Sequence, residues 1–274
     1  MRPLLAVDGD SFAHRAFHAL PRSFRRADGG PANALTGFMS MLLRLWQAER
    51  PRAVVVGWDT LGVPTYRNAL LESYQSGREF DPEIVEQLAL LPSLVSSTGI
   101  VCCKAEGYEA DDFLAAFVAA ERARAGTTLV ATSDRDAFQL AAADATILQP
   151  VRGTSELARI GPAEVRERYG VAPEQVCDFI ALRGDPSDRI PGARGVGAKT
   201  AASLLQTYPD LEAMLAAGRF EAEAERLRLY RRIAALDPGA PVPDLPDVEP
   251  DWAAGARAAE ALGVERLAAR LRDA

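Results

Sequence analysis

The sequence predicts an α/β fold in which a parallel sheet carries helices on both faces and is followed by a helical region. In the first half of the chain, short runs of β-branched residues alternate with longer helical patterns, as in consecutive βαβ units. After about residue 160 no clear strand pattern remains, and short helical patterns are separated by Gly and Pro. The 274 residues suffice for one large domain or two small ones. We therefore expect an α/β domain at 1–160 and a helical region at 161–274.

Each element is predicted from its own local pattern. Runs of β-branched and apolar residues predict five strands: Leu4–Asp8, Ala53–Asp59, Ile100–Cys103, Thr128–Thr132 and Ala145–Leu148. Apolar residues at helical spacing predict helices at about 33–49, 82–97, 109–124 and 252–272. Five prolines within residues 237–250 predict an extended connector before the last helix.

Composition excludes several classes of protein. No apolar run is long enough to span a membrane as a helix. The net charge of −7 lacks the basic excess typical of DNA-binding domains, but it does not exclude DNA binding, because the acids are not spread evenly along the chain. Three cysteines without CxxC spacing and only two histidines argue against a disulfide scaffold or a zinc site, and they fit a reducing cytoplasm. Any metal must then be held by carboxylates.

Aspartates lie at the ends of three predicted strands. Asp8 and Asp59 end the first two strands, and Asp134 and Asp136 lie just beyond the fourth. Because the carboxyl ends of parallel strands meet at one edge of a sheet, we expect these side chains to converge there. Gathered carboxylates repel one another unless cations neutralise them, and oxygen ligands alone favour Mg²⁺ or Mn²⁺. The pattern therefore predicts a metal site.

A second acidic cluster lies in the segment GYEADDF, at the predicted start of a helix. Its members Glu109 and Asp112 are three residues apart and share one helix face, with Asp111 beside them. Acids in a first helical turn also stabilise a helix through its dipole, which is the ordinary explanation of such a cluster. That explanation does not account for aspartates at three strand ends, so we favour metal binding.

A glycine-rich segment, GDPSDRIPGARGVGAKTA, begins at residue 184 and contains two further acids, Asp185 and Asp188, three residues apart. It is not a phosphate-binding P-loop, because alanine stands at both positions where that motif needs glycine and no strand precedes it. It fits a helix-hairpin-helix turn, which binds DNA phosphates through backbone N–H groups without reading sequence. The residues that would form this turn and open its second helix are Gly195, Gly197, Lys199 and Thr200.

Together these motifs resemble one family, the bacterial and bacteriophage 5′ nucleases, which include the 5′→3′ exonuclease domain of DNA polymerase I and the flap endonucleases. VDGDSFAHRAFHAL resembles the family's opening strand and helix, and VVGWDT its second strand. PTYRNALLESYQSGR resembles the family's arch, here at about 64–92, through which a single-stranded 5′ end passes. GYEADD and TSDRD resemble its central acids, and residues 184–205 its helix–three-turn–helix element. The resemblance implies a PIN-like, Rossmann-like core followed by a helical DNA-binding region.

The resemblance also implies roles for individual residues. It implies two divalent cations, Mg²⁺ or Mn²⁺, and a K⁺ ion at the hairpin. The implied metal ligands are Asp8, Asp59, Glu109, Asp111, Asp112, Asp134, Asp136, Asp185 and Asp188. The implied catalytic residues other than these acids are Arg15, Arg67 and Arg78. The implied DNA contacts are Arg15, Tyr74, Gly195, Gly197, Lys199 and Thr200.

The activity implied by the resemblance is two-metal hydrolysis of DNA phosphodiesters at 5′ flaps, nicks or 5′ ends, in replication and repair. The expected form is a stand-alone, cytoplasmic and nucleoid-associated monomer that has a DNA polymerase as partner and no membrane contact. Two residues depart from the family's pattern: Gln75 stands where the family has lysine, and Arg189 where it has asparagine. The first departure leaves open a protein that binds branched DNA but cuts it poorly. A phosphatase or a PIN-type ribonuclease is a third alternative, which would lack the hairpin.

Overall fold

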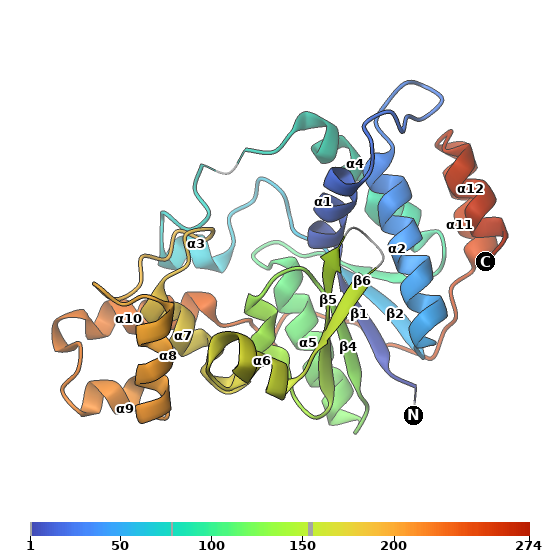
Figure 1. The fold of residues 1–274 in the computed structure, drawn as a ribbon. Helices are drawn as coiled ribbons and strands as arrows, with labels where there is room; N and C mark the ends of the chain where they lie inside the picture. The colour runs from blue at the N-terminus through green and yellow to red at the C-terminus, as the bar shows by residue number, and fades with distance from the viewer. Residues whose placement is uncertain (1, 78, 153–155) are drawn as a thin grey trace.

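One six-stranded sheet forms the centre of the α/β part (Figure 1). The structure is a computed structural model that describes residues 2–77, 79–152 and 156–274. In chain order the strands are β1 (Leu4–Asp8), β2 (Ala53–Gly57), β3 (Val101–Cys103), β4 (Thr128–Ala131), β5 (Ala145–Arg152) and β6 (Glu156–Ile160). Their order across the sheet is β3-β2-β1-β4-β5-β6. Strands β1 to β5 are parallel, and β6 pairs with β5 in the antiparallel direction.

Helices cover both faces of the sheet. They are α1 (Gly9–Ala19), α2 (Asn33–Glu49), α4 (Pro82–Ser96), α5 (Ala110–Ala123), α11 (Trp252–Ala261) and α12 (Glu265–Arg272). Alternate residues of a buried strand point to opposite faces, so Leu5 and Val7 of β1 join one apolar cluster and Leu4 and Ala6 the other. The cluster of Leu5 and Val7 includes buried side chains of α1, α2, α4, α11 and α12. The cluster of Leu4 and Ala6 includes buried side chains of α5 and of the helical region. Figure 1 shows α11 and α12 beside α2, on the side away from the helical region.

The helical region follows β6. Its elements are α6 (Pro162–Tyr169), η2 (Pro173–Gln175), α7 (Val176–Arg183), α8 (Ala198–Thr207), α9 (Leu211–Ala216), η3 (Glu221–Glu223) and α10 (Ala224–Ala234). Residues 241–250 contain neither helix nor strand, as the proline-rich pattern predicted. They return the chain to the α/β part, where the backbone N–H of Val248 donates to the carbonyl of Arg52. In the described part of the chain, no helix is both long and apolar enough to cross a membrane.

Most predicted elements are confirmed, and their ends differ in detail. The helix at 33–49 and the strand Leu4–Asp8 agree with the prediction, whereas β2 ends at Gly57 and β5 continues to Arg152. Strand β6 was not predicted, because it is a short edge strand in which only the last residue is fully buried. The expected single helix at 252–272 is wrong: Gly263 adopts φ +68°, which favours glycine and separates α11 from α12.

Only the first part of the segment expected to form an arch, residues 64–92, lies outside the packed α/β layer. Its first part contains only the short helix α3 (Tyr66–Leu70), followed by turns up to residue 77. Its last part, from Pro82 onward, belongs to α4, whose Ile84, Leu88 and Leu91 are buried in the cluster that contains α1 and α2. Residues 82–92 are therefore part of the packed α/β layer. The domain boundary at residue 160 remains a prediction.

Candidate active site

Three aspartates lie at the carboxyl ends of β2, β1 and β4, which are neighbours in the sheet. Asp8 is the last residue of β1, Asp59 follows β2, and Asp134 follows β4. Asp8 also caps α1: it accepts hydrogen bonds from the backbone N–H of Ser11 at 2.9 Å and from Thr132 Oγ1 at 2.7 Å. The predicted acidic edge is thus present, and the aspartate of its central strand is held from two sides.

A cavity of about 250 Å³ opens at this edge and is lined by carboxylates. We call five of them the first acidic group: Asp8, Asp10, Asp59, Glu109 and Asp111. Burial raises the pKa of Asp8 from 3.8 to about 7, and repulsion from Asp59 adds to this shift. Burial also raises the pKa of Asp111 well above its usual value, and the charges of Asp8 and Asp134 raise it further. The acids therefore lie close enough to affect one another's ionisation.

The first acidic group has the chemistry of a site for hard cations. Asp111 Oδ1 is buried and accepts no hydrogen bond from any residue in the described ranges, although a buried carboxylate oxygen normally has a partner. Oxygen ligands of this kind and number suit Mg²⁺ or Mn²⁺. Across residues 2–77, 79–152 and 156–274, no three acidic, histidine or cysteine side chains already surround a common ion position.

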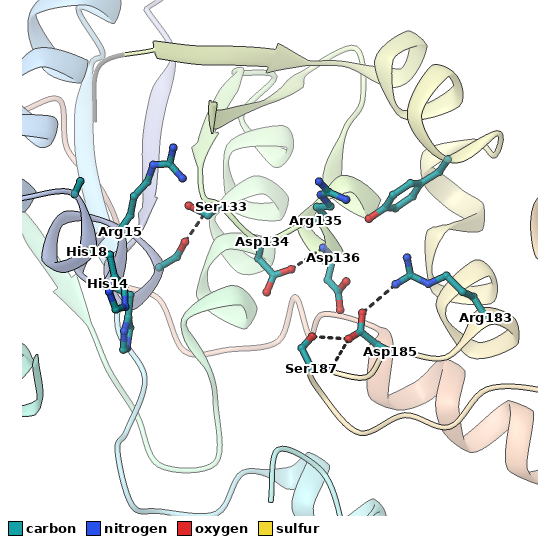
Figure 2. Close-up of a pocket in the computed structure, with 13 residues that line it drawn as sticks. His14, Arg15, His18, Ser133, Asp134, Arg135, Asp136, Arg183, Asp185 and Ser187 are labelled. Carbon is teal, nitrogen blue, oxygen red and sulfur yellow. Dashed lines mark hydrogen bonds and ion pairs between the residues drawn. The ribbon is translucent and has the colours of Figure 1, made fainter. Parts of the chain in front are cut away.

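A larger cavity of about 860 Å³ lies beside the first and combines acids with cations (Figure 2). Asp134 and Asp136 line it, and Arg183 Nη2 donates to Asp185 Oδ2 at 3.0 Å. Burial raises the pKa of Asp136 well above its usual value, and Asp134, Asp188 and Asp185 raise it further. The second acidic group consists of Asp134, Asp136, Asp185 and Asp188. The cations and imidazoles that line the same cavity are His14, Arg15, His18, Arg135 and Arg183.

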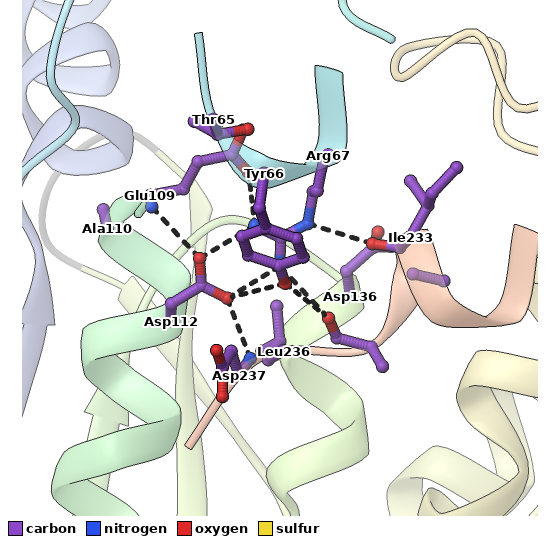
Figure 3. A network of polar contacts seen from close by, with 12 residues as sticks. Thr65, Tyr66, Arg67, Glu109, Ala110, Asp112, Asp136, Ile233, Leu236 and Asp237 are labelled. Atoms are coloured by element: carbon purple, nitrogen blue, oxygen red, sulfur yellow. Dashed lines mark hydrogen bonds and ion pairs between the residues drawn. The ribbon is translucent and has the colours of Figure 1, made fainter. Parts of the chain in front are cut away.

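Asp112 and Arg67 form a buried ion pair instead of facing a cavity (Figure 3). Arg67 is 1% exposed, and its guanidinium donates to both Asp112 oxygens at 2.7 and 2.8 Å. It also donates to the carbonyls of Ile233 and Ala235. Asp112 is fully buried and additionally accepts from the backbone N–H groups of Glu109 and Asp237. The expectation that Asp112 binds metal and Arg67 contacts substrate does not fit this structure, because both side chains are fully engaged.

Tyr74 also differs from its expected role. It is 4% exposed, and its hydroxyl donates to Glu109 Oε2 at 3.0 Å, so its ring is not available to stack on a DNA base. The next residue, Gln75, donates from Nε2 to the Tyr74 hydroxyl at 2.9 Å and to Asp188 Oδ1 at 3.1 Å. The side chain of Arg189, the other residue that departs from the family's pattern, lies against Gly77.

The glycine-rich turn is open to solvent. Gly195 adopts φ +76°, and a Cβ atom at Gly195 or Gly197 would meet no atom within 4 Å. Helix α8 begins directly after Gly197 without a side-chain cap, and Lys199 and Thr200 are exposed in its first turn. Uncapped N–H groups at a helix start, with a lysine beside them, suit a phosphate group. The DNA contacts of this turn remain a prediction.

Three residues of the site were missed by sequence reasoning. Asp10 is 8% exposed, lines the first cavity, and accepts from the backbone N–H of Asp59 at 2.7 Å through Oδ2. The sequence indicated Asp10 only by its position two residues after Asp8, which ends the first predicted strand. Arg135 stands between two predicted ligands, and Arg183 immediately precedes the glycine-rich segment, so both could have been considered. Arg78, which the resemblance implied as catalytic, lies outside the described residues.

The fold and the acidic edge define a class, the PIN-like nucleases. Residues 3–170 match the family described as the 5′-3′ exonuclease N-terminal resolvase-like domain, and residues 171–251 match the 5′-3′ exonuclease C-terminal SAM fold. The chain therefore belongs to the 5′-3′ exonuclease family. The resemblance identified from the motifs is thereby confirmed.

Curated relatives agree with this assignment. DNA polymerase I of Mycobacterium tuberculosis is 39% identical over 214 residues, which are 77% of this chain and 24% of that protein. DNA polymerase I of Deinococcus radiodurans is 39% identical over 210 residues, 76% of this chain and 21% of that protein. The chain thus spans about a quarter of the length of the curated relatives it matches.

Two solved structures show a similar fold. A T5 5′-exonuclease with bound zinc has a TM-score of 0.71 at 18% identity and covers 99% of both chains. The catalytic core of Rad2 in complex with DNA substrate has a TM-score of 0.58 at 16% identity and covers 98% of this chain and 92% of that one.

The acidic groups predict an inverted pH dependence of stability in the cation-free protein. The pKa values of Asp8 and Glu109 rise from 3.8 and 4.5 to about 7 in the folded state, mainly through burial. Between the ordinary pKa values of these carboxyls and about pH 7, the folded state binds more protons than the unfolded state. The free energy of unfolding therefore decreases as pH rises through this range. In EDTA we expect the Tm to fall between pH 5 and pH 8, and Mg²⁺ to restore it at pH 8 far more than at pH 5. A scanning calorimetry series that shows a flat or rising Tm in EDTA would contradict this prediction.

Proposed function

We propose that this chain is a structure-specific 5′ nuclease that hydrolyses DNA phosphodiesters at 5′ flaps, nicks or 5′ ends. One observation carries the proposal: the first and second acidic groups adjoin at Asp134, on the carboxyl edge of a parallel sheet. Membership of the 5′-3′ exonuclease family supports it. The open turn before α8 supports it as well, because such a turn can hold the phosphate backbone beside the acids.

The two acidic groups would each hold one divalent cation. Bound there, Mg²⁺ or Mn²⁺ would supply an activated water and stabilise charge on the leaving oxygen. The chain's own residues orient the ligands, because Thr132 holds Asp8, Arg183 holds Asp185, and Asp10 fixes the backbone at Asp59. Such outer contacts restrict the positions that the carboxylates can take.

DNA would contact two surfaces of the chain. The turn before α8 would bind the duplex backbone through its N–H groups and Lys199, with a K⁺ ion at the hairpin. Arg15 and Arg135 line the larger cavity, and the planar guanidinium group suits phosphate oxygens. The proposal also includes a DNA polymerase as partner, since the relatives are DNA polymerase I, and a cytoplasmic, nucleoid-associated monomer.

The test is cleavage of a 5′-labelled flap duplex with Mg²⁺, with Mn²⁺ and with EDTA. We expect products cut near the junction in either cation and none in EDTA, because the carboxylates alone cannot activate water or neutralise the leaving oxygen. Nick and 5′-end substrates measured in parallel would establish the preferred DNA.

Two controls separate the alternatives. Lys199→Ala should weaken duplex binding and reduce its salt dependence while cleavage at saturating protein continues. Tight flap binding without product in any cation would instead support the branched-DNA-binding protein, and release of phosphate from small esters with no action on flaps would support a phosphatase.

A further inference from the structure

Two adjacent residues, Tyr74 and Gln75, connect the two acidic groups. The Tyr74 hydroxyl donates to Glu109 Oε2 at 3.0 Å, and Glu109 belongs to the first acidic group. Gln75 Nε2 donates to the Tyr74 hydroxyl at 2.9 Å and to Asp188 Oδ1 at 3.1 Å, and Asp188 belongs to the second acidic group. A continuous chain of three hydrogen bonds therefore runs from Glu109 to Asp188. We call Tyr74 and Gln75 the bridge.

The direction of these hydrogen bonds is determined by the chemistry of the groups. An ionised carboxylate only accepts, so once Glu109 is ionised, as a cation ligand must be, the hydroxyl proton of Tyr74 points to Glu109. The hydroxyl oxygen then accepts from the amide of Gln75, whose second N–H is left for Asp188. The reversed amide would place the carbonyl oxygen of Gln75 against the Asp188 carboxylate, where the two would repel. Each member of the bridge therefore depends on the next.

The bridge is also held rigidly. Tyr74 is 4% exposed, and its ring packs in the apolar cluster that contains α5 and α7. Gln75 adopts φ +49°, a conformation that is costly for a residue with a side chain and persists only where contacts enforce it. Its backbone N–H donates to the carbonyl of Asp188 at 3.3 Å, which adds a second contact to the same residue. These contacts link the position of Glu109 to that of Asp188.

Resting on the proposed function, we propose that the bridge positions Glu109 relative to Asp188 and couples cation binding at the two acidic groups. A cation that draws Glu109 into its ligand position moves Tyr74 and Gln75 with it, and so places Asp188 for the second cation. The second cation then meets a carboxylate that is already in position, which is a positive coupling between two sites. Tyr74 and Gln75 are positioning residues, because they act through the carboxylates.

Calorimetric titration of the full chain with Mn²⁺ tests the bridge. In the wild type we expect two bound ions. Tyr74→Phe keeps the buried ring and removes only the hydroxyl, and Gln75→Ala removes the amide but keeps the backbone contact. Each should weaken binding of the second ion about tenfold and that of the first by less than about twofold. The double variant should also lose about tenfold rather than a hundredfold, because either change breaks the same chain.

Tyr66→Phe is the matched control. Its hydroxyl lies on the same segment but contacts Asp112 and the carbonyl of Ala235, neither of which belongs to an acidic group. It should lower the Tm slightly and leave both Mn²⁺ affinities within about twofold of the wild type. If the wild type binds two ions and both bridge variants keep its affinities, the proposed coupling through the bridge is wrong, and the proposed function is unaffected. If the wild type binds none, the proposed function fails and the bridge fails with it.

Discussion

The Asp111→Asn variant is expected to lose flap cleavage by roughly 10³-fold while gaining stability in the absence of cations. Asparagine has nearly the shape of aspartate, so the first turn of α5 should keep its conformation. The loss follows because Asp111 lines the first cavity and its Oδ1 is buried without a hydrogen-bond partner in the described residues. The gain follows because burial and the charges of Asp8 and Asp134 all oppose ionisation of this side chain. At pH 8 in EDTA, the Tm should rise by roughly 5 °C.

Asp244→Asn is the control for this variant, because Asp244 is exposed in the proline-rich connector. It should change neither cleavage nor the Tm beyond experimental error. Flap cleavage and calorimetry on the same preparations provide both readouts. Retention of full cleavage by Asp111→Asn would remove Asp111 from the cation ligands. Loss of cleavage together with a lower Tm would show that the substitution acts by damaging the fold.

The acidic edge was predictable because it depends on chain topology. Asp8 ends a short strand, and Asp59 and Asp134 follow two others. Parallel strands that are neighbours bring their carboxyl ends together whatever packs around them. The order β2-β1-β4 then places these three acids next to one another. Local patterns of apolar residues are enough to establish such an arrangement, which is why this part of the site could be read from the sequence.

The roles of the acids of α5 were not predictable in the same way. Asp111 and Asp112 are adjacent in the first turn, but successive residues on a helix point about 100° apart. Asp111 faces the cavity because Asp112 is paired with a side chain from another element. That partner is Arg67, from an element more than forty residues earlier in the chain, and no local pattern indicates the contact. Tyr74 was misjudged for the same reason, because its burial depends on α5 and the helical region.

The largest loss of stability is expected for Arg67→Ala, at about 3–5 kcal/mol in the free energy of unfolding. Removing the guanidinium leaves the Asp112 carboxylate fully buried without its opposite charge, and it frees the carbonyls of Ile233 and Ala235. These contacts join α3, α5 and the end of α10, so three elements lose a common anchor. Chemical denaturation measures the change. Arg228→Ala is the control, since its ion pair with Glu212 is exposed and screened by water, and its loss should change the free energy of unfolding far less.

A double variant distinguishes an ion pair that supports the fold from a catalytic arginine. Arg67→Met combined with Asp112→Leu removes both charges and keeps apolar volume, so it should recover much of the stability that Arg67→Ala loses. If Arg67 acts only through the fold, variants that remain folded should cleave flaps at a rate close to that of the wild type. A small loss of rate is expected where Glu109 is displaced, because Arg67 Nη1 also donates to Glu109 Oε2 at 3.1 Å. An Arg67→Ala protein with wild-type stability and no cleavage would reverse the assignment and make Arg67 a substrate contact, as the resemblance implied. The burial of its guanidinium against two carboxylates argues for the first outcome, since a substrate phosphate would have to displace them both.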